Sequence, residues 1–101
     1  MVKVEVLYFD GCPSWRTAWG KLADVLTELG IDANVSLRNI DDLDPETRHG
    51  FAGSPTIRIN GRDLEDYDGP PVMACRRYMD NSGRGWPSKT LLRQRLENAR
   101  D

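Results

Sequence analysis

The chain opens with a short stretch whose apolar residues first alternate and then run together. Val2, Val4 and Val6 alternate with two charged residues, and the stretch from Val6 to Phe9 is wholly apolar. Alternation is typical of a strand with one face in the core, and a continuous apolar run is typical of a strand buried on both faces. We therefore expect a strand over residues 2–9 that enters at the rim of a sheet and becomes fully buried.

The spacing of apolar residues then changes to that of a helix. Pro13 is favoured at the first helical position, because its missing N–H costs nothing there. Gly30 is typical of a helix end. Between these two residues the apolar positions recur at helical spacing: Trp15, Ala18, Trp19, Leu22, Leu26 and Leu29. The sequence therefore predicts a helix that begins at Pro13 and is ended by Gly30.

The rest of the chain divides into shorter segments. Residues 33–40 alternate again and predict a second, more exposed strand. Asp44 and Pro45 are typical of the cap and first turn of a short helix, which ends by Gly50. Residues 56–59 predict a strand, and the Asn-Gly pair that follows is a strong signal for a tight turn.

Residues 62–71 are acidic and rich in proline, which indicates a loop or an insertion. Residues 72–79 predict the fourth strand and residues 87–99 the last helix. The order is thus strand, helix, strand, short helix, strand, strand, helix. This order predicts an α/β domain with a four-stranded mixed sheet and helices covering both faces.

Composition narrows the class of protein. A chain of 101 residues suits one domain, so we expect residues 1–101 to form a single one. The net charge of −2 lacks the basic excess of nucleic-acid-binding domains. The longest apolar run is far shorter than the roughly 20 residues of a membrane span, and the N-terminus has no small-residue cleavage site. Two cysteines are too few for a disulfide-stapled secreted scaffold. We therefore expect a cytoplasmic protein that binds neither nucleic acid nor membranes.

The two cysteines are the main candidates for chemistry. Cys12 lies where the buried strand gives way to the helix, and unpaired N–H groups and the helix dipole favour a thiolate at such a place. Burial would instead raise the pKa of the Cys12 thiol, so a structural role is the alternative interpretation. Cys75 lies in the predicted strand 72–79, where its simpler interpretation is a core residue, because free cysteine is among the most buried residue types.

Two motifs resemble the thioredoxin-like superfamily: YFDGCPSW at residues 8–15 and GSPT at residues 53–56. The resemblance implies a thioredoxin-like fold in which Cys12 is the nucleophile. It also implies a cis peptide bond before Pro55, facing Cys12, and backbone hydrogen bonds from Ser54 to an extended substrate. We expect Pro13 and Trp15 to line the substrate groove.

The sequence departs from the family at one position that matters. Trp15 replaces the second cysteine of Cys-x-x-Cys, and thiol–disulfide exchange needs a second thiol to expel the partner. Two routes stay open. An external thiol resolves the intermediate, as in the monothiol branch of glutaredoxins, or Cys75 does so if its Cα lies within about 4.4–6.8 Å of that of Cys12. We therefore expect a thiol redox protein, without cofactor, whose substrate is a thiol or disulfide of glutathione or of a protein.

A narrower resemblance is carried by the CPSW segment, the strand after Pro55 and the late Cys75-Arg76 pair. These features are similar to small bacterial thioredoxin-like proteins catalogued near alkylmercury lyase, an enzyme that uses two distant cysteines and an aspartate. No aspartate lies beside Cys12 on the helix, where Trp15 stands, so we expect no lyase activity.

The alternative function is a non-catalytic binding protein, either for a peptide or for a soft metal such as mercury or copper. Two thiolates suit a soft metal in low coordination. We expect no structural zinc, because two cysteines and His49 fall short of four close ligands. The oligomeric state stays open.

Overall fold

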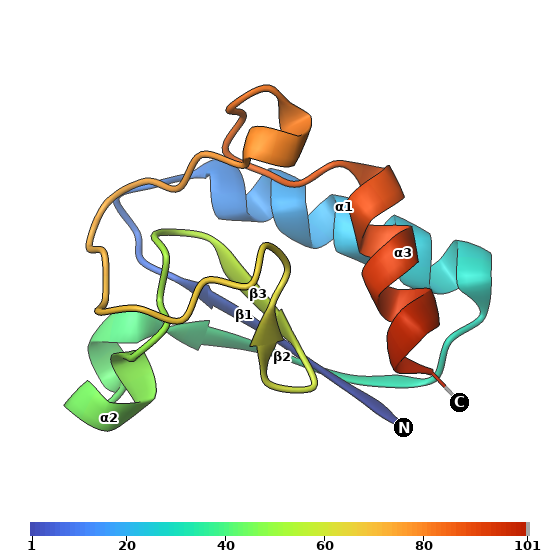
Figure 1. Cartoon of the computed structure of the whole chain (residues 1–101), viewed down its shortest axis with the longest axis horizontal. Helices are drawn as coiled ribbons and strands as arrows, with labels where there is room; N and C mark the ends of the chain where they lie inside the picture. The colour runs from blue at the N-terminus through green and yellow to red at the C-terminus, as the bar shows by residue number, and fades with distance from the viewer. Residues whose placement is uncertain (101) are drawn as a thin grey trace.

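A four-stranded mixed sheet forms the centre of the computed structural model, which describes residues 1–100 (Figure 1). Its strands are β1 (Val2–Tyr8), β2 (Ala33–Asn39), β3 (Thr56–Ile59) and β4 (Arg62–Asp63). Their order is β2-β1-β3-β4, with β1 parallel to β2 and antiparallel to β3, and β3 antiparallel to β4. The predicted four-stranded mixed sheet is therefore confirmed.

The central strand β1 is buried on both faces, as its sequence predicts. Val4 and Val6 point into the larger core, and neither is exposed at all. Leu7 points to the other face and joins a smaller core cluster. Glu5 lies on that second face as well, where its carboxylate pairs with the Arg38 guanidinium of β2 at 3.3 Å. Burial on both faces follows from the position of β1 between β2 and β3.

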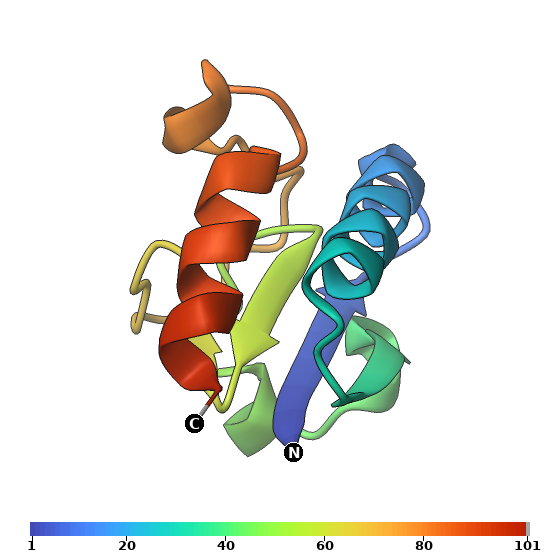
Figure 2. The same ribbon diagram turned by 90° about the vertical axis from the view of Figure 1, so that its right-hand side faces the viewer.

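Two long helices cover one face of the sheet. α1 (Ser14–Leu29) and α3 (Lys89–Ala99) lie side by side above it (Figures 1 and 2). Both bury leucines in the larger core, which also includes the valines of β1. On the opposite face lie the 3-10 helix η1 (Ile40–Asp42) and the short helix α2 (Pro45–Arg48). They cover the smaller cluster, whose buried members are Leu7, Ile40, Leu43 and Phe51.

The helix ends follow local capping chemistry. Pro13 takes the cap position, so that α1 begins one residue later than predicted, and Gly30 ends it in the left-handed conformation. α3 begins at Lys89 because the Ser88 side chain caps it by accepting from the N–H of Leu91. The Asp44 cap of α2 is confirmed. Hydrogen bonds from Thr47 hold the pKa of Asp44 below its usual range.

The Asn60-Gly61 turn reverses the chain at once, and this corrects the predicted loop over residues 62–71. Asn60 and Gly61 both have positive φ, which is the geometry of a two-residue hairpin turn. Ile59 therefore pairs directly with Arg62 across the turn. β4 is thus formed by the first two residues of the segment that its acidic and proline-rich composition had indicated to be a loop.

The predicted strand over residues 72–79 is wrong. The segment makes only isolated bridges, from Cys75 to Ser54 and from Tyr78 to Arg84, and leads into the 3-10 helix η2 (Met79–Asn81). Its apolar residues do not form a buried face, since Val72 and Met73 are exposed. With β4 already at the edge of β3, this segment is not needed as the fourth strand.

None of the helices within residues 1–100 has both the length and the apolar character needed to cross a bilayer.

Candidate functional site

The two cysteines of the chain form a disulfide bond. Cys12 and Cys75 are 63 residues apart in sequence, and their Cα atoms lie 5.6 Å apart. This separation falls in the range that an intramolecular pairing requires. Cys12 is only 2 % exposed. Cys75 is exposed and does not belong to the core, so the interpretation of Cys75 as a core residue is wrong.

Cys12 lies in the turn between β1 and α1. Its N–H donates to the carbonyl oxygen of Phe9 at 3.4 Å, and the exposed Pro13 follows it at the helix cap. No side chain caps the N-terminus of α1, and its first turn holds no acidic residue. Cys12 directly precedes the cap residue of α1, so it lies at the positive end of the helix dipole, which favours negative charge there.

Cys75 is held beside the peptide bond between Ser54 and Pro55, which is cis. The Ser54 N–H donates to the carbonyl oxygen of Ala74 at 2.9 Å, and its carbonyl oxygen accepts from the N–H of Arg76 at 3.0 Å. These are the backbone groups that Ser54 is expected to offer to a substrate, and the chain's own residues occupy both. The hydroxyl oxygen of Ser54 accepts from the N–H of Phe9 at 3.1 Å, which ties this loop to the end of β1.

Gly53 permits the close approach of the Cys75 segment. Its φ of +105° lies in the region that residues with a side chain rarely adopt. A Cβ atom at this position would lie 2.7 Å from the carbonyl oxygen of Ala74 and 3.1 Å from the Cα of Arg76. A glycine is therefore required both by the backbone conformation and by the packing.

Trp15 is half-buried at the start of α1. Its ring centroid lies 4.6 Å from that of Tyr8 at the end of β1. On this ring the guanidinium of the exposed Arg16 lies 5.1 Å from the centroid. Trp15 therefore packs across the junction between strand and helix that carries Cys12.

A buried ion-pair network fixes the residue after Cys75. The Arg76 guanidinium donates to both carboxylate oxygens of Asp63, one of them at 2.7 Å, and to Glu65 at 3.2 Å. The side chains of Arg76 and Asp63 are 4 % and 1 % exposed. Burial lowers the pKa of Arg76 more than any other single cause, but the hydrogen bonds to Asp63 and Glu65 and the electrostatic effects of Asp63 and Tyr78 together outweigh it and raise the pKa. Arg76 therefore stays charged.

Tyr78 links the same segment to Pro55. Its hydroxyl donates to the carbonyl oxygen of Pro55 at 2.7 Å, and the Arg76 guanidinium lies 4.2 Å from the centre of its ring. Burial raises the pKa of the Tyr78 phenol, which therefore remains a neutral donor. The segment that carries Cys75 is thus anchored by main-chain and side-chain contacts.

Sequence reasoning missed the network formed by Asp63, Arg76 and Tyr78. Asp63 belongs to an acidic run that is typical of a solvated loop. The signal that was available is its position directly after the Asn-Gly turn, where a returning strand places one of its first residues toward the core. Its partner Arg76 lies 13 residues further along the chain and outside any helix, so no local spacing indicates the pair.

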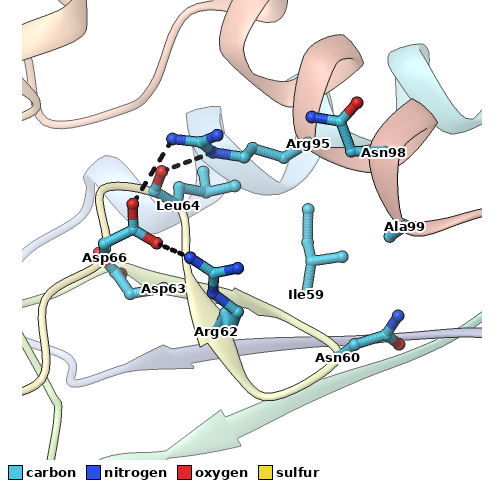
Figure 3. Close-up of a pocket in the computed structure, with 9 residues that line it drawn as sticks. All are labelled: Ile59, Asn60, Arg62, Asp63, Leu64, Asp66, Arg95, Asn98 and Ala99. Carbon is cyan, nitrogen blue, oxygen red and sulfur yellow. Dashed lines mark hydrogen bonds and ion pairs between the residues drawn. The ribbon is translucent and has the colours of Figure 1, made fainter.

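Two hollows lie near the Cys75 segment and the β3–β4 hairpin. An open one of about 740 Å³ is lined by Cys75, Ala52, Tyr67 and Arg77, among others. A smaller one of about 250 Å³ lies between the β3–β4 hairpin and α3, and Figure 3 shows Arg95 reaching across it toward Leu64. Cys75 lines the open hollow, whereas neither cysteine lines the smaller one.

Comparisons of the chain with protein-family models, with curated proteins and with solved structures found no match.

Proposed function

We propose that this chain is a thiol–disulfide redox protein of thioredoxin-like fold, with Cys12 and Cys75 as its redox couple. The observation that carries the proposal is the bond between these two cysteines, which are the only ones in the chain and lie 63 residues apart in sequence. One of them precedes a long helix and the other is exposed beside an open hollow. A purely structural disulfide requires neither a position before a helix nor exposure beside a hollow.

The thioredoxin-like assignment is supported by the sheet and by the two motifs. The four-stranded mixed sheet, with β1 and β2 parallel and joined through α1, is consistent with a thioredoxin-like fold. The motifs at residues 8–15 and 53–56 are distant in sequence, but the bond from Cys12 leads to Cys75, which pairs with Ser54. Cys75 therefore supplies the second thiol of the pair, which Trp15 cannot supply, so no external resolving thiol is required.

The chemistry is a two-electron exchange. Two external thiols reduce the bond to two cysteine thiols and are themselves joined as a disulfide, and the reverse reaction oxidises the pair. The N-terminus of α1 stabilises the thiolate that forms on Cys12. A disulfide opens faster when negative charge on the leaving sulfur is stabilised, so the same feature favours Cys12 as the leaving sulfur.

Equilibration with glutathione buffers tests the proposal. Native protein is incubated at a series of ratios of reduced to oxidised glutathione, quenched by acid and alkylated, and its two thiols are counted by mass spectrometry. We expect a reversible two-electron titration, together with accelerated reduction of a model protein disulfide. The variants Cys12→Ser and Cys75→Ser serve as controls and should lose this acceleration. A bond that stays closed in reducing buffer while the protein remains folded would refute the proposal.

The same pair of cysteines favours soft-metal binding as a second candidate. Reduction leaves two thiols whose Cα atoms are close enough for both sulfurs to bind one ion such as Hg(II) or Cu(I). Equilibrium dialysis of reduced protein against a competing monothiol tests this idea. Tight binding of one ion by the native protein, lost in Cys12→Ser and in Cys75→Ser, would support it. Equal binding by all three proteins would eliminate it.

A further inference from the structure

The two cysteines of the disulfide differ in exposure to solvent. Cys12 is 2 % exposed and is enclosed by the junction of β1 and α1. Cys75 is exposed and lines the open hollow of about 740 Å³. A thiolate that opens a disulfide must reach one sulfur from the side opposite the other. Of the two residues, Cys75 is the one that is open to solvent, so we expect this attack to occur on Cys75.

The anchoring of the Cys75 segment keeps this sulfur in place when the bond opens. Main-chain hydrogen bonds join Ser54 to the residue before Cys75 and to the residue after it. The Arg76 side chain is bound to Asp63 and Glu65 in a buried site. None of these contacts involves the sulfur atoms. Cys75 therefore stays beside Cys12 in the reduced protein, and attack does not require the segment to leave.

We propose that exchange takes place at Cys75 and that Cys12 is the leaving and resolving thiol; this inference rests on the proposed redox function. An incoming thiolate forms a bond to the Cys75 sulfur, the bond between Cys12 and Cys75 breaks, and its electron pair stays on Cys12. The negative charge is thus formed at the N-terminus of α1, where the helix favours it. A second external thiolate then attacks the external sulfur, which yields the external disulfide and the Cys75 thiolate.

The reverse direction assigns the same roles. The Cys75 thiolate attacks one sulfur of a disulfide substrate, the S–S bond of the substrate breaks, and its first half leaves as a thiolate. The Cys12 thiolate then attacks the Cys75 sulfur of the mixed disulfide and expels the second half as a thiolate. The external partner is therefore always carried on Cys75. This is the opposite of the assignment that the sequence resemblance implies, in which Cys12 is the nucleophile that meets the substrate.

Trapping of the mixed disulfide tests the inference on the native protein. Oxidised protein is mixed with mercaptoethanol, quenched by acid after short intervals and cleaved into peptides, and the mercaptoethanol adduct is located by mass spectrometry. We expect about tenfold more adduct on Cys75 than on Cys12, because only Cys75 is accessible. An adduct mainly on Cys12 would overturn the inference and leave the redox function standing. A bond that mercaptoethanol never opens would overturn both.

Two matched variants give an independent measurement. Cys12→Ser leaves only the Cys75 thiol and Cys75→Ser only the Cys12 thiol, with serine keeping nearly the same volume at each position. Their reaction with dithiobis(nitrobenzoate) is followed as a function of pH, so that the plateau rate of each thiolate is compared apart from its pKa. In the folded state we expect Cys75 to react about tenfold faster at the plateau.

The control for these variants is the same reaction in concentrated guanidinium chloride, where the two rates should converge. Far-UV circular dichroism establishes that both variants are folded. Equal plateau rates in the folded state, or a faster Cys12, would overturn the inference.

Discussion

Opening of the Cys12–Cys75 bond is expected to cost a large part of the stability of the fold. The bond closes a loop across a sequence separation of 63 residues. In the chain-entropy model a loop of this length removes about 14 cal/mol/K from the unfolded ensemble, which is about 4 kcal/mol at room temperature. For a domain of this size such a loss corresponds to a fall in the melting temperature of roughly 15–30 °C.

Urea unfolding measures this contribution. Oxidised protein, reduced protein and the double variant Cys12→Ser/Cys75→Ser are compared by circular dichroism. The reduced protein and the double variant should agree with each other and lie about 4 kcal/mol below the oxidised protein. The dependence on urea should be steeper for these two, because their unfolded chains are less compact.

A thermodynamic cycle provides the second half of the experiment. The amount by which the disulfide raises the free energy of unfolding must equal the amount by which folding favours formation of the disulfide. Formation of the disulfide from glutathione should therefore be about a thousandfold more favourable in the native chain than in the denatured one. A stability difference below about 1 kcal/mol, or equal glutathione equilibria in the two states, would refute the loop-entropy reasoning.

Three further substitutions have defined outcomes. Asp63→Asn leaves the Arg76 charge buried with a weakened partner, and we expect a loss of about 3–5 kcal/mol in urea unfolding; a loss below about 1 kcal/mol would contradict a buried pair. Gly53→Ala places a Cβ against the carbonyl of Ala74 at a φ of +105°, and we expect about a tenfold shift of the glutathione equilibrium toward the dithiol. Gly20→Ala is the matched control, since a Cβ there meets nothing within 4 Å; it should leave that equilibrium unchanged and stabilise α1 by about 0.5–1 kcal/mol.

The parts of the fold that the sequence predicts well are those set by local chemistry. The valines of β1 alternate, Asp44 caps α2, and the Asn60-Gly61 pair adopts the positive φ values that its residues allow. Each of these features is decided within a few residues. The number of strands was predicted correctly, but the fourth strand was placed at residues 72–79 instead of at Arg62–Asp63. The tight turn starts β4 within the segment that its acidic composition had indicated to be a loop.

The segment over residues 72–79 shows why the error arose. Its buried positions are Arg76 and Tyr78, while Val72 and Met73 are exposed. Hydrophobicity alone favours burial of Val72 and Met73 and exposure of Arg76, which is the opposite of what the fold shows. Arg76 is buried only because Asp63 neutralises it, and that pairing depends on the tertiary structure.

The candidate site was predictable in the same uneven way. The place of Cys12 before a helix follows from the proline after it and the apolar spacing beyond. The pairing of Cys12 with Cys75 does not follow from any local pattern. It depends on the close approach of the Cys75 segment to Gly53 and on its main-chain hydrogen bonds with Ser54. The burial of Cys12 and the exposure of Cys75 are likewise properties of the folded chain alone.

The disulfide makes a covalent ring of residues 12–75, and α3 lies outside this ring. α3 is attached to it by noncovalent contacts, among them the buried Leu92 and Leu96 and the ion pair between Arg93 and Glu28 of α1. Local unfolding of α3 therefore requires no change in the covalent ring. We therefore expect amide hydrogen exchange in α1 to be slower in the oxidised protein than in the reduced protein. In α3, exchange should proceed through local opening of that helix, at a rate that does not depend on the oxidation state of the cysteines.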